Sequence, residues 1–173
     1  MLKISQPAPN FSLLGDDGHI HNLRDFLKNP LVIFFYPKDL TPGCTKVACD
    51  FSENFEEFRK LNTAIIGISR DSLASHMRFK SKHSLRPLLL SDPDLAVHKI
   101  YGAWGEKVLY GKVSTGVIRS TFLIDENGLI IKAWHRVRVK NHVKAVLDTL
   151  LKRPDIMLNQ KKNAEGGTRT RTG

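Results

Sequence analysis

Long apolar runs are missing from this 173-residue chain. No stretch approaches the ~18 consecutive apolar residues that suggest a membrane-spanning helix. The N-terminal segment, MLKISQPAPNF, also lacks the apolar h-region of a secretory signal peptide. We therefore expect a cytoplasmic protein that has no membrane partner.

Acidic residues are few, with 17 Asp and Glu against 27 Lys and Arg, which gives a formal net charge of +10. Residues 152–173 hold six basic and two acidic residues, a net +4, so residues 1–151 hold the other +6. The basic residues of this longer part are scattered. Nucleic-acid binding would need a concentrated basic stripe. We therefore expect no nucleic-acid partner and attribute the charge to solvated surface.

The length fits one well-buried domain better than two. Strand and helix patterns alternate up to residue 151, after which NQKKNAEGGTRTRTG has no apolar periodicity. We expect a single domain at 3–151 followed by a basic, disordered tail at 152–173.

The periodicity of the apolar residues predicts the order of elements along the domain. An N-terminal hairpin around GDDG precedes a buried strand at 31–37, a helix that follows Thr41 and runs to Leu61, and a second buried strand at 64–69. A helix to about residue 82, a short strand at PLLLSD, and a helix from Pro93 to Tyr101 follow. Two strands flanking Asn127-Gly128 and a helix at 140–151 complete the chain. The order predicts an α/β fold, with a central mixed β-sheet flanked by helices and an N-terminal β-hairpin.

Cysteine is scarce as well, and both cysteines lie in the stretch DLTPGCTKVACDF, at Cys44 and Cys49. A structural zinc site needs four ligands, and neither the C-x4-C spacing nor the distant His76 and His83 fits a compact zinc module. A thioredoxin-type redox pair would read C-x-x-C. Two inert, buried cysteines remain the simplest alternative.

Helix geometry argues against that alternative for Cys49. Five residues at ~100° each place Cys49 about 140° around the helix from Cys44. This position lies away from the apolar stripe of Val47 and Phe51, on the side of Glu53. An exposed cysteine is open to oxidation, so we expect a chemical role for it.

Cys44 falls in the first turn of the same predicted helix. With Thr41 as the N-cap and Pro42 at the first helical position, Cys44 is the third residue of the helix. Free backbone N–H groups and the positive end of the helix dipole favour a thiolate there.

Arg119 interrupts the otherwise apolar segment VIRSTFLID, which we predict to be a central strand. A guanidinium in such a position is costly to leave unpaired. It either forms a salt bridge with a carboxylate or faces an anion in a site, such as a thiolate, and the residues alone leave both possibilities open.

The stretch FFYPKDLTPGCTKVACDF strongly resembles the active-site segment of peroxiredoxins, in particular the bacterioferritin-comigratory protein or peroxiredoxin Q branch. The family pattern P-x-x-x-T-x-x-C reads here as Pro37, Thr41 and Cys44. The resemblance continues through PAPNFSL, YGAWGEK, GVIRSTFLID and KAWHRVRVKNHVKAVLDTL, and covers residues 3–151.

The resemblance implies a thioredoxin-like fold and a thiol peroxidase that requires no metal or organic cofactor. We expect a monomer, although the sequence does not decide between a monomer and a dimer. Cys44 would be the peroxidatic cysteine, which attacks a peroxide and becomes a sulfenic acid. Cys49 would be the resolving cysteine, with thioredoxin, or else glutaredoxin, as the reductant. Thr41 would hold the peroxide and the thiolate, Pro37 would shield the site from water, and Arg119 would stabilise the thiolate.

Two other functions use the same residue types. A disulfide-exchange oxidoreductase needs only a thiolate and a resolving thiol, and a redox sensor needs no catalytic turnover. The hydroxyl of Thr41, three residues before Cys44, suits an oxygen substrate and favours the peroxidase. In an intact helix the Cα atoms of residues 44 and 49 lie ~8.7 Å apart, beyond the reach of a disulfide. We therefore predict that the first turns of this helix unwind before the two cysteines can bond.

Overall fold

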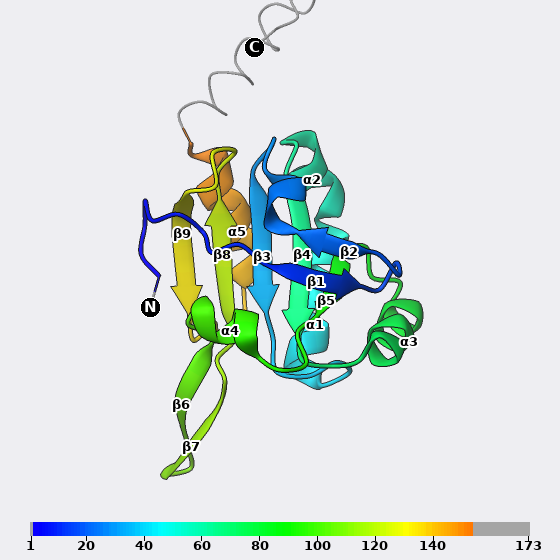
Figure 1. Ribbon diagram of the computed structural model, residues 1–173, viewed down its shortest axis with the longest axis vertical. Helices are drawn as coiled ribbons and strands as arrows, with labels where there is room; N and C mark the ends of the chain where they lie inside the picture. Colours follow the sequence, from blue (N-terminus) through cyan, green and yellow to red (C-terminus); the bar gives the residue numbers. More distant parts are fainter. Residues whose placement is uncertain (1, 154–173) are drawn as a thin grey trace, which may run out of the picture.

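A single mixed sheet forms the centre of the computed structural model, which describes residues 2–153 (Figure 1). Its strands are β1 (Ser12–Gly15), β2 (Ile20–Asn22), β3 (Leu31–Phe35), β4 (Ala64–Ser69), β5 (Leu88–Ser91), β8 (Ser120–Ile124) and β9 (Ile130–His135). The helices are the 3-10 turn η1 (Leu23–Phe26), α1 (Pro42–Glu53), α2 (Phe55–Lys60), α3 (Leu73–His83), α4 (Ala96–Ile100) and α5 (His142–Leu151). The tail predicted at 152–173 lies, from residue 154 on, outside the described residues.

The strand order of the sheet is β2-β1-β5-β4-β3-β8-β9. Strands β3, β4 and β5 are parallel, whereas β8 pairs antiparallel with β3, and the β1–β2 hairpin pairs antiparallel with β5. This arrangement confirms the predicted thioredoxin-like α/β fold with a mixed sheet and an N-terminal hairpin.

Helices cover both faces of the sheet. Residues of α1, α2, α3 and α5 pack on one face, and residues of η1 and α4 pack on the other. All five residues of β3 are buried, as expected for a strand covered on both sides. Phe34 of β3 stacks on Phe51 of α1 with ring centroids 4.8 Å apart, which fixes α1 against the sheet.

The parallel pairing of β3 with β4 depends on a glycine at one position. Gly67 lies opposite Phe34 in the register. A Cβ atom at Gly67 would lie 2.6 Å from the ring of Phe34, so any other residue would displace that ring from its place under α1.

The prediction of a single helix from Pro42 to Leu61 is wrong, because the chain divides at Asn54 into α1 and α2. The side-chain amide of Asn54 donates to the backbone oxygen of Asp50, which also accepts from the Asn54 backbone N–H. The helix from Pro93 instead starts at Ala96, after Leu95 in a left-handed conformation, and the last helix starts at His142 rather than Lys140.

The strand predicted through VIRSTFLID is also divided. Val117 ends β7 (Lys112–Val117), which pairs only with β6 (Trp104–Leu109), and Ser120 begins β8 in the main sheet. The β6–β7 hairpin was not predicted, and it projects from the body of the molecule (Figure 1). Arg119 therefore lies at the junction between two sheets and not inside a central strand.

Candidate active site

Cys44 occupies the first turn of α1, as the sequence predicts. Thr41 is the N-cap residue and Pro42 the first residue of the helix. The side chain of Cys44 is buried, with 1% exposure, among the apolar residues between α1 and the sheet. Both cysteines are free thiols in this structure. The helix N-terminus thus presents its unpaired N–H groups and positive dipole end to a buried thiol.

Arg119 reaches Cys44 across the gap between β8 and α1. Its Nη2 atom donates a hydrogen bond of 3.2 Å to the Cys44 Sγ. Gly43 makes room for this approach, since a Cβ atom there would lie 3.0 Å from Nη2. The sequence left open whether Arg119 pairs with a carboxylate or faces a group such as a thiolate. The structure places a sulfur atom beside this guanidinium.

The backbone around Arg119 is held from both sides. The Ile118 N–H donates to the oxygen of Ala103, and the Val137 N–H donates to the oxygen of Arg119. The Nε atom of Arg119 is buried and has no hydrogen-bond partner among residues 2–153. The guanidinium therefore keeps a donor group unused in addition to the one that faces the sulfur.

Thr41 and Pro37 lie in the segment between β3 and Cys44. The Thr41 hydroxyl donates to the Lys38 backbone oxygen at 2.8 Å, and the side chain does not cap the helix. Because its proton is engaged, the Thr41 oxygen is left as an acceptor. Pro37 is partly buried and, with Arg119, lines a pocket of about 290 Å³.

This pocket is completed by residues that the sequence did not indicate. They come from the β6–β7 hairpin, from the junction before β8 and from the segment after β9: Lys107, Val108, Ile118, Arg136 and Val137. The sequence signal that could have indicated the hairpin is Tyr110-Gly111, a turn between two segments in which polar and apolar residues alternate. Gly111 adopts φ +77° in this turn. Because its lining combines apolar and cationic side chains, the pocket has an apolar surface and a positive charge.

Cys49 lies near the middle of α1 and is partly buried, not fully exposed as expected. It packs at the edge of the same apolar cluster that contains Cys44. Burial raises the pKa of the Cys49 thiol, and the carboxylates of Glu53 and Asp50 raise it further, while Lys46 acts in the opposite direction. The neutral thiol is therefore the favoured form of Cys49.

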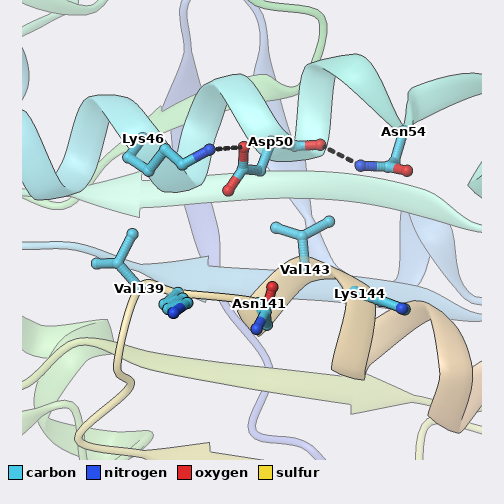
Figure 2. A pocket seen from close by; sticks show the side chains of 8 residues that line it. Lys46, Asp50, Asn54, Val139, Asn141, Val143 and Lys144 are labelled. Atoms are coloured by element: carbon cyan, nitrogen blue, oxygen red, sulfur yellow. Dashed lines mark hydrogen bonds and ion pairs between the residues drawn. The ribbon is translucent and has the colours of Figure 1, made fainter.

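The flank of α1 next to Cys49 borders a second pocket, of about 490 Å³, between α1 and the start of α5 (Figure 2). Lys46 forms an ion pair of 2.8 Å with Asp50 along this flank. Lys140, Asn141 and Lys144 line the opposite side. Neither cysteine lines this pocket.

None of the helices between residues 2 and 153 has the length and apolar character needed to cross a bilayer. In the same residues, no group of three or more His, Cys, Asp or Glu side chains is placed to hold a metal ion.

Comparison with known proteins links this arrangement to one family. Residues 4–133 match the model of the AhpC/TSA family. Peroxiredoxin Bcp of Bacillus subtilis strain 168 is 46% identical over 149 residues, which cover 86% of this chain and 95% of that protein. A structure of the Xanthomonas campestris bacterioferritin comigratory protein, studied for its alkyl peroxide reduction activity, is 41% identical with a TM-score of 0.77, covering 81% of this chain and 89% of the other.

The spacing of Cys44 and Cys49 differs from that of the two cysteines replaced in one relative. Peroxiredoxin Q of Xanthomonas campestris, 41% identical to this chain with a TM-score of 0.77 (81% of this chain and 89% of that chain covered), has been solved with a cysteine at its position 48 or at its position 84 replaced by serine. Those two cysteines are 36 positions apart, whereas Cys44 and Cys49 are five apart. The role of Cys49 is therefore argued below from the structure of this chain.

Proposed function

We propose that this chain, which belongs to the AhpC/TSA family and is a thiol peroxidase of its Bcp/PrxQ branch, reduces alkyl hydroperoxides and hydrogen peroxide through Cys44. The observation that carries the proposal is the 3.2 Å contact between the Arg119 Nη2 and the Cys44 Sγ at the N-terminus of α1. A fixed cation and a helix dipole both favour the thiolate, which is the nucleophilic form of cysteine.

In the first step the Cys44 thiolate attacks the terminal oxygen of the hydroperoxide. The S–O bond forms as the O–O bond breaks, Cys44 becomes a sulfenic acid, and the leaving oxygen takes a proton and departs as alcohol or water. Negative charge moves from the sulfur to the departing oxygen during this step. The guanidinium of Arg119, which already contacts the sulfur, suits the stabilisation of that charge.

Thr41 and Pro37 prepare the substrate for this attack. The Thr41 oxygen, whose own proton is given to Lys38, is free to accept a hydrogen bond from the O–H of a hydroperoxide. Pro37 has no N–H and presents its ring to the pocket beside Arg119, which limits the access of water to the thiolate. Val108 and Val137 in that pocket are suited to an alkyl chain.

Cys49 is the resolving cysteine in this proposal. Its thiol attacks the sulfenic sulfur, a disulfide forms between residues 44 and 49, and the sulfenic oxygen leaves as water. The intact α1 helix holds the two Cα atoms ~8.7 Å apart, too far for a disulfide. The first turns of α1 must therefore unwind between the two steps, and helix ends are segments of low local stability.

A cytoplasmic dithiol protein, thioredoxin or else glutaredoxin, then reduces the disulfide and returns both cysteines to thiols. The cycle requires only one chain, so a monomer is sufficient, and residues 3–151 form its catalytic domain. The only reactants are the peroxide and the dithiol, and the site residues themselves supply the remaining chemistry.

Steady-state consumption of tert-butyl hydroperoxide and hydrogen peroxide tests the proposal with the thioredoxin and glutaredoxin systems supplied in turn. Turnover with at least one of them, together with a 44–49 disulfide identified by mass spectrometry, is the expected result. Reduction of insulin disulfides without peroxide turnover would instead identify a disulfide-exchange oxidoreductase.

The unwinding step has its own test in hydrogen exchange of the reduced and oxidised proteins. We expect amide protection across residues 44–50 to fall once the disulfide has formed. Undiminished protection alongside a 44–49 disulfide would refute unwinding, and a disulfide found only between chains would refute the pairing.

A further inference from the structure

A buried aspartate lies in the middle of the loop that carries the active-site residues. Asp39 is two positions after Pro37 and two before Thr41, and it is 4% exposed. A buried carboxylate is costly unless it is paired and hydrogen-bonded. The peroxide chemistry gives Asp39 no role, so its burial has to be explained by its partners.

Three side chains converge on the Asp39 carboxylate. The Tyr36 hydroxyl donates to Oδ1 at 2.6 Å, and the Ser75 hydroxyl donates to Oδ2 at 2.8 Å. His76 Nδ1 lies 2.7 Å from the same Oδ2. Ser75 and His76 belong to α3, so these contacts join the active-site loop to a helix more than 30 residues further along the chain.

The other nitrogen of His76 also faces an acceptor. Its Nε2 lies 3.0 Å from the backbone oxygen of Leu90 in β5. A carbonyl oxygen cannot donate, so Nε2 must carry a proton, and a second proton lies between Nδ1 and the carboxylate. Both side chains are 1% exposed or less, so the pair holds two protons out of contact with water.

The backbone of Asp39 is fixed by the same region. Its N–H donates to Asp71 Oδ2 at 2.8 Å, and that carboxylate oxygen also accepts from the Ser69 hydroxyl. With both its backbone and side chain held, Asp39 is followed by Leu40 at φ +65°. A non-glycine residue in this region is energetically unfavourable, and surrounding contacts must impose it.

The left-handed Leu40 decides how the chain enters α1. Directly after it, Thr41 takes an extended conformation as the N-cap, and Cys44 follows in the first turn. The Thr41 hydroxyl is directed to Lys38, on the other side of Asp39. The direction of the Thr41 oxygen relative to the Cys44 sulfur thus depends on where Asp39 is held.

We infer that the buried Asp39–His76 pair positions Thr41 against Cys44 and so sets the rate at which the thiolate is oxidised. The pair does not touch the reacting atoms. Arg119, the residue before β8, contacts the sulfur, and the pair holds the active-site loop to α3 and β5. This inference rests on the peroxidase function proposed above.

The chain contains a matched control for this inference, because a second buried His–Asp pair lies on α4. His98 Nδ1 is 2.6 Å from Asp92 Oδ2, and both side chains are 1% exposed or less. The Nε2 of His98 has no partner among the described residues, so this ring has no second acceptor to satisfy. The His98 pair joins α4 to the loop after β5, outside the active-site loop.

The test compares His76→Gln and Asp39→Asn with His98→Gln. The second-order rate of Cys44 oxidation by tert-butyl hydroperoxide is measured under conditions where circular dichroism shows each variant to be folded. We expect His76→Gln and Asp39→Asn to lower this rate between about tenfold and hundredfold, since a misplacement of ~1 Å has effects of this size. His98→Gln should leave it within about twofold, as expected for independent sites.

Alkylation of Cys44 by iodoacetamide separates positioning from general loosening. This reagent needs a thiolate but no hydrogen bond to Thr41, so we expect the peroxide rate to fall more than the alkylation rate. A double-mutant cycle of His76→Gln with Thr41→Val should also be non-additive, because one residue acts through the other. Ser75→Ala, which removes one donor only, provides a milder variant should His76→Gln fail to fold.

Unchanged peroxide oxidation in the folded variants, equal losses in the peroxide and alkylation rates, or an additive cycle would each overturn the inference. These results are distinct from a failure of the proposed function. That function is tested by Cys44→Ser, which addresses the nucleophile and not its position.

Discussion

Two cysteines of one helix lie in opposite electrostatic surroundings. Cys44 is buried at the N-terminus of α1 and accepts a hydrogen bond from Arg119. Cys49, one and a half turns further on, is partly exposed, and Glu53 and Asp50 contribute to its raised pKa. A cation and a helix dipole favour a negative sulfur at the first position, whereas carboxylates oppose it at the second.

In the proposed cycle, this difference separates the two steps in time. The thiolate that reacts with peroxide is at Cys44, while Cys49 remains a neutral thiol that is much less open to oxidation. On this proposal, Cys49 becomes a reaction partner only after Cys44 has been oxidised, and α1 then has to open. The first turns of α1 thus act both as the site that activates one thiol and as the barrier that keeps the other away.

Replacing each cysteine by serine is expected to have the largest effect. Cys44→Ser should abolish peroxide turnover with the fold intact, because a serine hydroxyl is not ionised at neutral pH. Cys49→Ser should retain one round of Cys44 oxidation and lose multiple turnover with a dithiol protein as reductant. Stopped-flow and steady-state assays measure the two steps, and substantial turnover by Cys44→Ser would contradict the assignment.

Acid should lower the free energy of unfolding through His142, the first residue of α5. Burial, and to a smaller extent the charge of Arg119, lower its pKa to about 4 from the usual 6.5. The unfolded chain therefore binds the proton more readily, and the stabilising contribution, complete above pH 6.5, is lost as the pH falls towards 4. We expect about 2 kcal/mol to be lost between pH 7 and pH 5.

Urea denaturation at the two pH values measures this loss. His142→Gln, which keeps a polar group near the Thr121 hydroxyl 2.8 Å away, is the matched variant. It should remove most of the pH dependence in this interval. An unchanged dependence in His142→Gln would assign the effect to other groups.

Arg119→Lys tests the charge at Cys44 while keeping its sign. Lysine loses the planar, multi-donor geometry of the guanidinium, so it cannot serve the sulfur and the leaving oxygen together. We expect the rate of Cys44 oxidation to fall by about tenfold. An unchanged rate, followed by mass spectrometry, would show that the 3.2 Å contact is structural only.

Glu53→Gln should have the smallest effect and acts on the other cysteine. Removing this carboxylate lowers the pKa of Cys49, because one of the groups that oppose its ionisation is gone. In the Cys44→Ser background, alkylation of Cys49 at pH 8 should become faster by less than about twofold, in line with charge pairs on exposed helix faces. Slower alkylation would contradict the assigned direction.

Local signals in the sequence predicted a large part of this arrangement. The apolar run at 31–37 gave a strand buried on both sides, and Thr41-Pro42 gave the start of α1 with Cys44 in its first turn. Both results depend on interactions within a few residues, namely side-chain burial along a strand and the preferences of helix caps. The break at Asn54 was missed because it depends on one side-chain amide that competes for a helical carbonyl.

Long-range contacts decided the rest of the site. Arg119 and Cys44 are 75 positions apart, and Asp39 and His76 are 37 apart. The sequence determined that a cysteine stands at a helix N-terminus and that a second one follows on another side of that helix, because helical periodicity is a local property. Only the tertiary structure decided which charges face each sulfur, because electrostatic partners are set by how distant segments pack and not by their order along the chain.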